Sequence, residues 1–239
     1  ALQSVENLGW KLASVIRGAS PPGLLATYDT ERQHGARENI LNSTRATDFM
    51  TPKNDVTRLF RDTVLDLARD YPFARALVNS GRLSVPCTYE DSPLNTPDTA
   101  DFARPMRPGS ACIDAPVSGG NGSGWLLNHL GNHFTVLVKG ALDRAQAEAL
   151  DSLRNTLAAD GVPLEVLVLD GPAQDREGYT NIASVGEVIG QRYDLGAGGI
   201  YLVRPDQHVA ARWRTLDVGA IDTAVHRALG FGEAMGEAA

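Results

Sequence analysis

The 239 residues contain only two cysteines, Cys87 and Cys112, and no CxxC motif. Two isolated thiols cannot supply the disulfide framework of a small secreted protein, so free thiols in a reducing cytoplasm are favoured over a disulfide. A thioredoxin-type redox centre needs two cysteines at CxxC spacing, and the sequence has none. We therefore expect a cytoplasmic protein without dithiol chemistry.

Long apolar runs and runs of like charge are also absent. No apolar stretch approaches the roughly 20 residues that span a bilayer, and no signal peptide is visible. The net charge of −7 is spread along the chain, which argues against nucleic-acid and anionic-membrane partners. A hydrophobic content of 43% and a charged content of 21% are typical of a globular protein.

The common catalytic and nucleotide-binding motifs are missing as well. There is no GxSxG elbow, P-loop or GxGxxG. His129 and His133 are four residues apart, but Gly131 is expected to end any helix between them, so we predict no metal site. The glycine-rich run 118–124 favours a flexible loop over a phosphate cradle. These motifs therefore identify no catalytic residue, and the catalytic residues are unknown from the sequence.

The chain begins without a methionine, inside an amphipathic helix that has no N-cap. Trp10 points away from the apolar stripe, so the helix is expected to have neighbours on two faces. The stripe comprises Leu2, Val5, Leu8, Leu12, Val15 and Ile16. We expect this chain to be the C-terminal portion of something larger.

Residues 1–80 are predicted to be helical. After a break at 18–23, a long charged helix follows, and TPKND then supplies a stop and a new N-cap. The helix after it is strongly amphipathic. Its apolar face includes Val56, Leu59, Phe60, Val64 and Leu67.

Residues 81–123 contain six prolines and show neither helical nor strand periodicity. Such a segment is either a linker or a functional covering loop. Its apolar anchors favour an ordered crossing between domains. These anchors are Leu83, Tyr89, Leu94, Phe102 and Met106.

Residues 124–239 show an α/β pattern. Two apolar runs, 134–140 and 163–171, flank a helix that opens with the capping-box pair Asp143 and Gln146. They predict a βαβ unit with parallel, buried strands. An antiparallel hairpin around Asp206 and a final helix follow. Together with a short element near Trp125, this order is that of a thioredoxin-like domain.

Two motifs near the start resemble the FAD-dependent aromatic hydroxylases of the phenol and 3-(3-hydroxyphenyl)propionate hydroxylase type. In that family a helix reading roughly D-A-x-N-L-x-W-K-L leaves the flavin, and L-L-x-x-Y-x-x-E-R follows it. The matching residues here are Asn7, Leu8, Trp10, Lys11 and Leu12, then Leu24, Leu25, Tyr28, Glu31 and Arg32. Ser4 replaces the acid usual in the family. RPG at 107–109, WLL-x-x-LG at 125–131 and LVRPD…VAARW at 202–213 resemble the thioredoxin-like tail of some members.

The resemblance implies an α/β protein. Its helical α+β part, residues 1–80, would complete the FAD and substrate domains, and 81–123 would lead to a thioredoxin-like domain at 124–239 without CxxC. It implies a monooxygenase that uses FAD, NAD(P)H and O2, through a flavin C4a-hydroperoxide, on a phenol-like substrate. Only Ala1 and Leu2 would lie near the flavin. The partners implied are the N-terminal FAD-binding portion and a second copy in a homodimer.

Two further interpretations stay open. The chain could be a non-catalytic dimerisation or interaction module of thioredoxin-like fold, which is compatible with the first hypothesis for a fragment. A free-standing redox relative of thioredoxin is disfavoured by the missing CxxC. For the side chains of NLGWKL and YDTER we favour roles in packing and ion pairing over contact with a cofactor. Alone, the chain is predicted to lack an FAD-binding fingerprint and activity.

Overall fold

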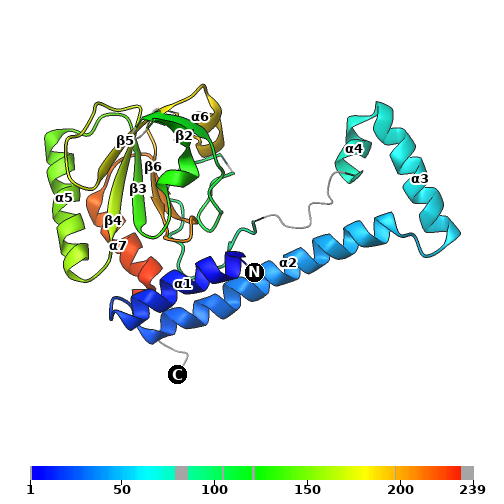
Figure 1. Ribbon diagram of the computed structural model, residues 1–239, viewed down its shortest axis with the longest axis horizontal. Coiled ribbons are helices and arrows are strands. Elements are labelled where there is room, and N and C mark those ends of the chain that lie inside the picture. Colours follow the sequence, from blue (N-terminus) through cyan, green and yellow to red (C-terminus); the bar gives the residue numbers. More distant parts are fainter. Residues whose placement is uncertain (1, 79–85, 104, 120–121, 197, 233–239) are drawn as a thin grey trace. The chain divides into compact units, whose positions relative to one another are not determined.

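The computed structural model describes residues 2–78, 86–103, 105–119, 122–196 and 198–232 (Figure 1). The chain divides into two compact units. The sheet unit consists of residues 1–31 and 88–239, and the helical unit of residues 32–87. The division predicted at residues 80 and 123 refers to the domains of a longer enzyme and stays a prediction.

Helices make up the first part of the chain and strands dominate the second. The helices are α1 (Leu2–Ile16), α2 (Ala26–Met50), α3 (Asp55–Asp70), α4 (Pro72–Val78), α5 (Arg144–Ala159), α6 (Val188–Tyr193) and α7 (Val218–His226), with short turns η1 (Pro22–Leu25), η2 (Leu126–His129) and η3 (Arg227–Phe231). The strands are β1 (Pro116–Gly119), β2 (Gly122–Trp125), β3 (Phe134–Lys139), β4 (Leu164–Leu169), β5 (Tyr179–Ser184), β6 (Ile200–Val203) and β7 (Val209–Trp213).

The helical unit is built on local signals. Asn54 caps α3 through a capping box, because its side chain accepts from the Thr57 N–H at 2.9 Å and its own N–H donates to the Thr57 hydroxyl at 3.2 Å. This confirms the N-cap predicted within TPKND. The Arg75 side chain ties α4 to α3 by donating to two carbonyls of the last turn of α3, those of Ala68 and Arg69.

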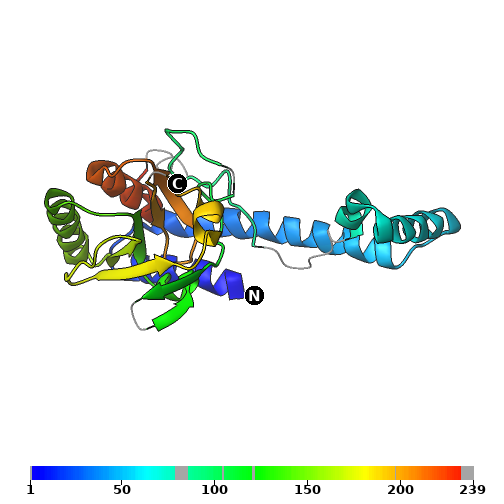
Figure 2. The same cartoon turned by 90° about the horizontal axis from the view of Figure 1, so that it is seen from above.

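The sheet unit has one seven-stranded mixed sheet in the order β2-β1-β5-β4-β3-β6-β7. β3 and β4 are parallel and are joined by α5, which confirms the predicted βαβ unit. β6 and β7 form the predicted antiparallel hairpin, and α7 follows it. The α/β class is thus confirmed, with the βαβ and ββα halves in the order expected for a thioredoxin-like domain. Figure 2 shows β5, in yellow, beside the green β1–β2 pair that extends the sheet.

Helices cover both faces of this sheet. α5 and α7 pack on one face, where Leu150 and Ile221 meet β3 and β4 residues such as Val136 and Val166. α6 packs on the other face with Ile189 and Tyr193. Strand β4 alternates between the two clusters because successive side chains point to opposite faces. Both faces of the central strands are therefore buried, which explains their almost continuous apolar sequence.

From residue 88 on, the described part of the proline-rich segment belongs to the sheet unit. Of its predicted anchors, Tyr89, Leu94 and Met106 are buried, whereas Leu83 lies outside the described residues. Gly109 has φ +88°, and a Cβ there would lie 2.4 Å from the Tyr89 carbonyl oxygen, so only glycine fits. Its N–H donates to the Val209 carbonyl at 2.7 Å, which joins the segment to β7.

The glycine-rich run 118–124 differs from the loop that we expected. Residues 116–119 and 122–125 form the antiparallel strands β1 and β2, and β1 also pairs with β5. The prediction was wrong for these residues because glycines carry no side chain, so a strand made of them shows no alternating hydrophobic pattern. Their pairing comes from backbone hydrogen bonds and from the neighbouring β5.

Candidate functional site

The predicted flavin edge falls at the first turn of α1. Ala1 lies outside the described residues, and Leu2 is 80% exposed. No acidic side chain occupies this turn, so its backbone N–H groups face no competing negative charge from the helix itself. The N-terminus of a helix favours negative charge, and the turn therefore fits the edge of an electron-rich ring. The assignment of Ala1 and Leu2 to cofactor binding stays a prediction.

Helix α1 turns its polar side inward. Asn7 and Lys11 are buried, whereas most of the apolar stripe is exposed in this chain, as expected for a helix that lacks its neighbours from a longer protein. The exposed members are Leu2, Val5, Leu12 and Ile16. Trp10 was expected to be exposed as well, and that expectation was wrong. Trp10 packs against the core, edge-on to Phe134 with ring centroids 6.0 Å apart. The inner face of the helix is thus held by polar groups and one indole ring.

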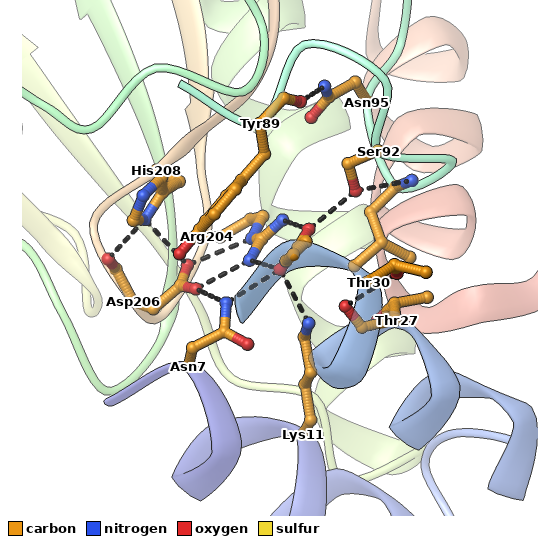
Figure 3. A network of polar contacts seen from close by, with 12 residues as sticks. Asn7, Lys11, Thr27, Thr30, Tyr89, Ser92, Asn95, Arg204, Asp206 and His208 are labelled. Atoms are coloured by element: carbon orange, nitrogen blue, oxygen red, sulfur yellow. Dashed lines mark hydrogen bonds and ion pairs between the residues drawn. The ribbon is translucent and has the colours of Figure 1, made fainter. Parts of the chain in front are cut away.

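Glu31, near the start of α2, is the centre of a network of polar contacts (Figure 3). Its Oε2 accepts from Lys11 Nζ and from Asn7 Nδ2, both at 2.7 Å. Its Oε1 accepts from the Ser92 hydroxyl at 2.6 Å. Arg204 donates to both oxygens, at 2.8 and 3.0 Å. One carboxylate therefore joins α1, α2, the proline-rich segment and the β6–β7 turn.

Asp206 provides the second carboxylate of the network. It accepts from Arg204 Nε at 3.0 Å and from Arg204 Nη2 at 2.6 Å. Asn7 Nδ2 donates to it at 3.0 Å, so Asn7 bridges Asp206 and Glu31. We call Asn7, Lys11, Glu31, Arg204 and Asp206 the buried charge cluster. Each of these side chains belongs to a residue that is at most 6% exposed.

Aromatic rings enclose the Arg204 guanidinium. Its carbon lies 5.3 Å from the Trp10 ring centroid and 6.0 Å from that of Tyr89. Tyr89 stacks on His208 with centroids 4.8 Å apart. These rings add cation–π attraction and exclude water from the ion pairs. Salt therefore screens these pairs much less than exposed ones.

The pKa values follow from burial and from the four charges. Burial favours a raised pKa for Glu31, but Arg204 and Lys11 outweigh it and lower that pKa to about 2. Burial and the nearby Arg204 lower the pKa of Lys11 to about 8, against the attraction of Glu31. Burial opposes the ionisation of Asp206, yet Arg204 and then His208 hold its pKa well below the usual range.

The cluster balances its charge, since two cations meet two carboxylates. Because every charged group is paired and buried, none is free to move a proton to or from a substrate. The arrangement can fix four segments against one another, and that is a structural task. This agrees with the packing and ion-pair roles predicted for Asn7, Lys11 and Glu31.

Sequence reasoning missed the partners of these residues, Arg204 and Asp206. Both lie in the LVRPD motif, and the signal was two charged residues that directly follow a buried strand. Neighbouring side chains alone could not reveal the contact, because 173 residues separate Arg204 from Glu31.

The two cysteines lie in different units, Cys87 at the end of the helical unit and Cys112 in the sheet unit. Cys87 is buried and Cys112 is half-buried, and the two are not bonded. Burial raises the pKa of the Cys112 thiol to about 12. Among the residues that the structure describes, no three histidine, cysteine or acidic side chains are grouped to hold a metal. Within the same ranges, no helix combines the length and apolar character that crossing a bilayer requires.

Comparisons with known proteins give a consistent result. Residues 1–43 match the family described as FAD binding domain. The chain is 27% identical over 235 residues to 3-(3-hydroxy-phenyl)propionate/3-hydroxycinnamic acid hydroxylase 2 of Burkholderia vietnamiensis, covering 95% of this chain and 42% of that protein. It is 32% identical over 219 residues to 6-methylpretetramide 4-monooxygenase of Streptomyces rimosus, covering 88% and 37%.

Solved structures agree with these relatives. The rebeccamycin biosynthetic enzyme RebC with reduced flavin matches with a TM-score of 0.64 and 25% identity, over 96% of this chain and 41% of that one. The flavin-dependent monooxygenase PieE, in complex with FAD and substrate, shares the fold with a TM-score of 0.66 and 22% identity, over 96% and 44%. The chain thus spans about two fifths of the length of these proteins.

Proposed function

We propose that this chain forms part of an FAD-dependent aromatic hydroxylase. The premise is that it is similar to such enzymes over nearly its whole length. The complete enzyme would hydroxylate a phenol-like ring with O2 and NAD(P)H. The observation that carries the proposal is that residues 1–43 match an FAD binding domain, and that the motif residues within them, Asn7, Lys11 and Glu31, meet in one buried cluster.

When bound, FAD would supply the electron transfer and the activation of oxygen. The residues of this chain would position the helix that meets the flavin and part of the cover over the substrate. The first turn of α1, which begins at Leu2, would present backbone N–H groups to the edge of the flavin ring, and we propose Ala1 and Leu2 as the residues nearest to it. The buried charge cluster would hold that helix, and residues 50–100 would contribute to the cover over the substrate.

A second candidate function is compatible with the first. The chain would be a non-catalytic interaction module, in which the thioredoxin-like tail and the helices act in dimerisation. The observation that favours it is the apolar face of α3, whose Leu59 and Phe60 are 69% and 60% exposed in this chain. In a homodimer of the longer enzyme, this face would be buried against a second copy or against the N-terminal portion.

The experiment compares the chain alone with the chain completed by an N-terminal FAD-binding portion, supplied in cis or in trans. The 239 residues contain no GxGxxG, so nothing in them would cradle a pyrophosphate. Alone, they are expected to bind no FAD and to oxidise no NAD(P)H. The completed protein should be yellow and should oxidise NAD(P)H in response to a phenol. Isolated chain that purifies with one FAD per molecule would contradict the proposal.

A further inference from the structure

We infer that Arg204 and Asp206 of the β6–β7 turn are positioning residues for α1, the helix that would face the flavin. The inference rests on the proposed function, because it gives the tail a task within that enzyme. The tail would affect the cofactor site by fixing the position of α1, and it would carry out no redox chemistry of its own.

The first step of the argument is that the turn itself is rigid. The Arg204 N–H donates to the His208 carbonyl at 2.8 Å. The Gln207 side chain donates to the carbonyls of Leu127 and Leu130, at 3.1 and 3.0 Å. Since the turn is fixed to η2 and closes two buried strands, Arg204 and Asp206 form a fixed support.

The second step is that α1 depends on this support. Its fully buried side chains are Asn7 and Lys11, and both end on the carboxylates that Arg204 binds. Asn7 reaches Asp206 directly at 3.0 Å. Trp10 lies over the same guanidinium. Much of the apolar stripe faces away, so these polar contacts, together with the packing of Trp10 on Phe134, hold the inner face of the helix.

The third step is distance. Asn7 lies five residues from Leu2, which is about 7.5 Å along a helix at 1.5 Å per residue. Over so short a length a helix moves as one body, so a shift at Asn7 reaches the first turn undiminished. A misplacement of about 1 Å can reduce a rate by as much as 100-fold. Arg204 therefore controls the placement of the turn that would meet the flavin.

The molecule contains a matched control. Arg212, on β7 of the same hairpin, is 4% exposed and binds Asp98 through two contacts, at 3.0 and 2.7 Å. It also donates to the Ala103 carbonyl at 3.0 Å. These two partners lie in the proline-rich segment, a further contact is with Tyr201 on β6, and none of the three lies on α1. Arg212→Met thus removes a part-buried ion pair that also has two contacts, and it does so without touching the helix.

The first experiment needs no flavin. Hydrogen exchange of the 239-residue chain is followed by mass spectrometry in peptides covering residues 2–16. Arg204→Met and Asp206→Asn should raise exchange in these peptides by about tenfold or more, whereas Arg212→Met should leave it within about twofold of the wild type. If Arg204→Met does not fold, Arg204→Lys, which keeps the charge but loses the paired contacts, serves instead. Unchanged exchange in α1, or an equal rise in the Arg212 variant, overturns the inference.

The second experiment uses the completed enzyme. Arg204→Met should weaken FAD binding by about tenfold or more, and Arg204→Lys should recover part of that loss. Arg212→Met should bind FAD as the wild type does, even if it melts earlier. Equal FAD affinity in the Arg204 and Arg212 variants overturns the inference. A completed wild type that takes up no FAD refutes the proposed function instead, while the exchange result still decides whether the turn holds α1.

Discussion

The two units of this chain differ in where they place their charges and their apolar side chains. The sheet unit buries both kinds, with apolar clusters on two faces of the sheet and four paired charges, one of which is Lys11 on α1. In the helical unit, the described ion pairs are exposed, and so are most large apolar residues. The exposed apolar residues are Ile40, Leu41, Met50, Val56, Leu59, Phe60, Leu65, Leu67, Tyr71, Phe73 and Leu77.

The comparison teaches that helix periodicity does not reveal which face is covered. α1 and α3 are both amphipathic, and both expose apolar side chains in this chain, but for different reasons. α1 is held from its polar side by buried partners. α3 has Val64 as its one buried residue and owes its helical state to its cap and to α4. The role of charge in the sheet unit can therefore be tested by removing members of its buried ion pairs. The helical unit can be tested by substituting its exposed side chains.

The largest effect is expected from Glu31→Gln. The change leaves Lys11 and Arg204 with one carboxylate between them, and breaking a buried pair costs about 3–5 kcal/mol. Urea unfolding followed by tryptophan fluorescence measures this loss, because Trp10, Trp125 and Trp213 all lie in the sheet unit. The matched change in the helical unit is Asp66→Asn, whose partner Arg69 lies 3.9 Å away in solvent. By far-UV circular dichroism that variant should stay within about 0.5 kcal/mol of the wild type. Equal losses of unfolding free energy in the two variants would contradict the claim that only the sheet unit depends on buried ion pairs.

Acid should weaken the sheet unit in a defined pH range. The pKa of Glu31 is about 2 in the folded state against 4.5 as its ordinary value. Between these values the unfolded chain binds a proton that the folded chain excludes, so the unfolding free energy falls as the pH drops from about 4.5 to about 2. The slope attributable to one proton is at most about 1.4 kcal/mol per pH unit. Asp206, whose pKa is also lowered, acts in the same direction.

The control for this prediction is Glu31→Gln, which cannot titrate at that position. Its unfolding free energy should depend less on pH over the same range, although it starts lower. A variant with the full wild-type slope would mean that other carboxyl groups cause the acid sensitivity.

Substitutions on the exposed apolar face of the helical unit should change how strongly the chain self-associates, and should hardly change its free energy of unfolding. Phe60→Ser removes an exposed ring from the apolar face of α3, and such faces favour self-association. Sedimentation at micromolar concentration should show less aggregation for this variant than for the wild type, while the unfolding free energy changes by no more than about 0.5 kcal/mol. Ile40→Ser, on α2 and 67% exposed, tests whether any exposed apolar residue of the unit acts alike. A large loss of stability in Phe60→Ser would show that the face is internal.

The smallest effect concerns the thiols. Thiolate is the reactive form of cysteine, and burial raises the pKa of Cys112 to about 12, so almost none is present at neutral pH. Cys87 is buried as well. In an insulin-reduction assay we expect no turnover, and Cys87→Ser and Cys112→Ser should match the wild type. Turnover that either substitution abolishes would contradict this expectation.

Local signals in the sequence predicted much of the fold. The capping pair Asp143 and Gln146 marked the start of α5, and both of its reciprocal hydrogen bonds form. The apolar runs of β3 and β4 gave the parallel pair. Strand β5 was missed because YTNIAS is largely half-buried and only Ile182 is fully covered. Its pairing comes from its neighbours, which a propensity pattern does not contain.

The candidate site could be predicted only in part. The resemblance marked Asn7, Lys11 and Glu31; Lys11 and Glu31 form an ion pair, and Asn7 donates a hydrogen bond to Glu31. The orientation of α1 could not be predicted from the sequence. An apolar stripe ordinarily faces the core, but here Lys11 is buried and most of the stripe is exposed. Arg204 and Asp206 enter through tertiary contacts that span most of the chain. Such contacts leave no local pattern.

The buried charge cluster also has a consequence for the order of folding. Asn7 and Asp206 are separated by 199 residues, so at about 5–20 residues per second a ribosome needs roughly 10–40 s to make the second after the first. During that interval α1 has neither the guanidinium nor the carboxylate of the turn that receives it. Contacts of such sequence separation slow folding, because the loop must close before they form. Within this chain, α1 would therefore be made before the β6–β7 turn and would dock on it only afterwards, and a nascent chain that stalls before residue 204 would leave the polar side of α1 without these partners.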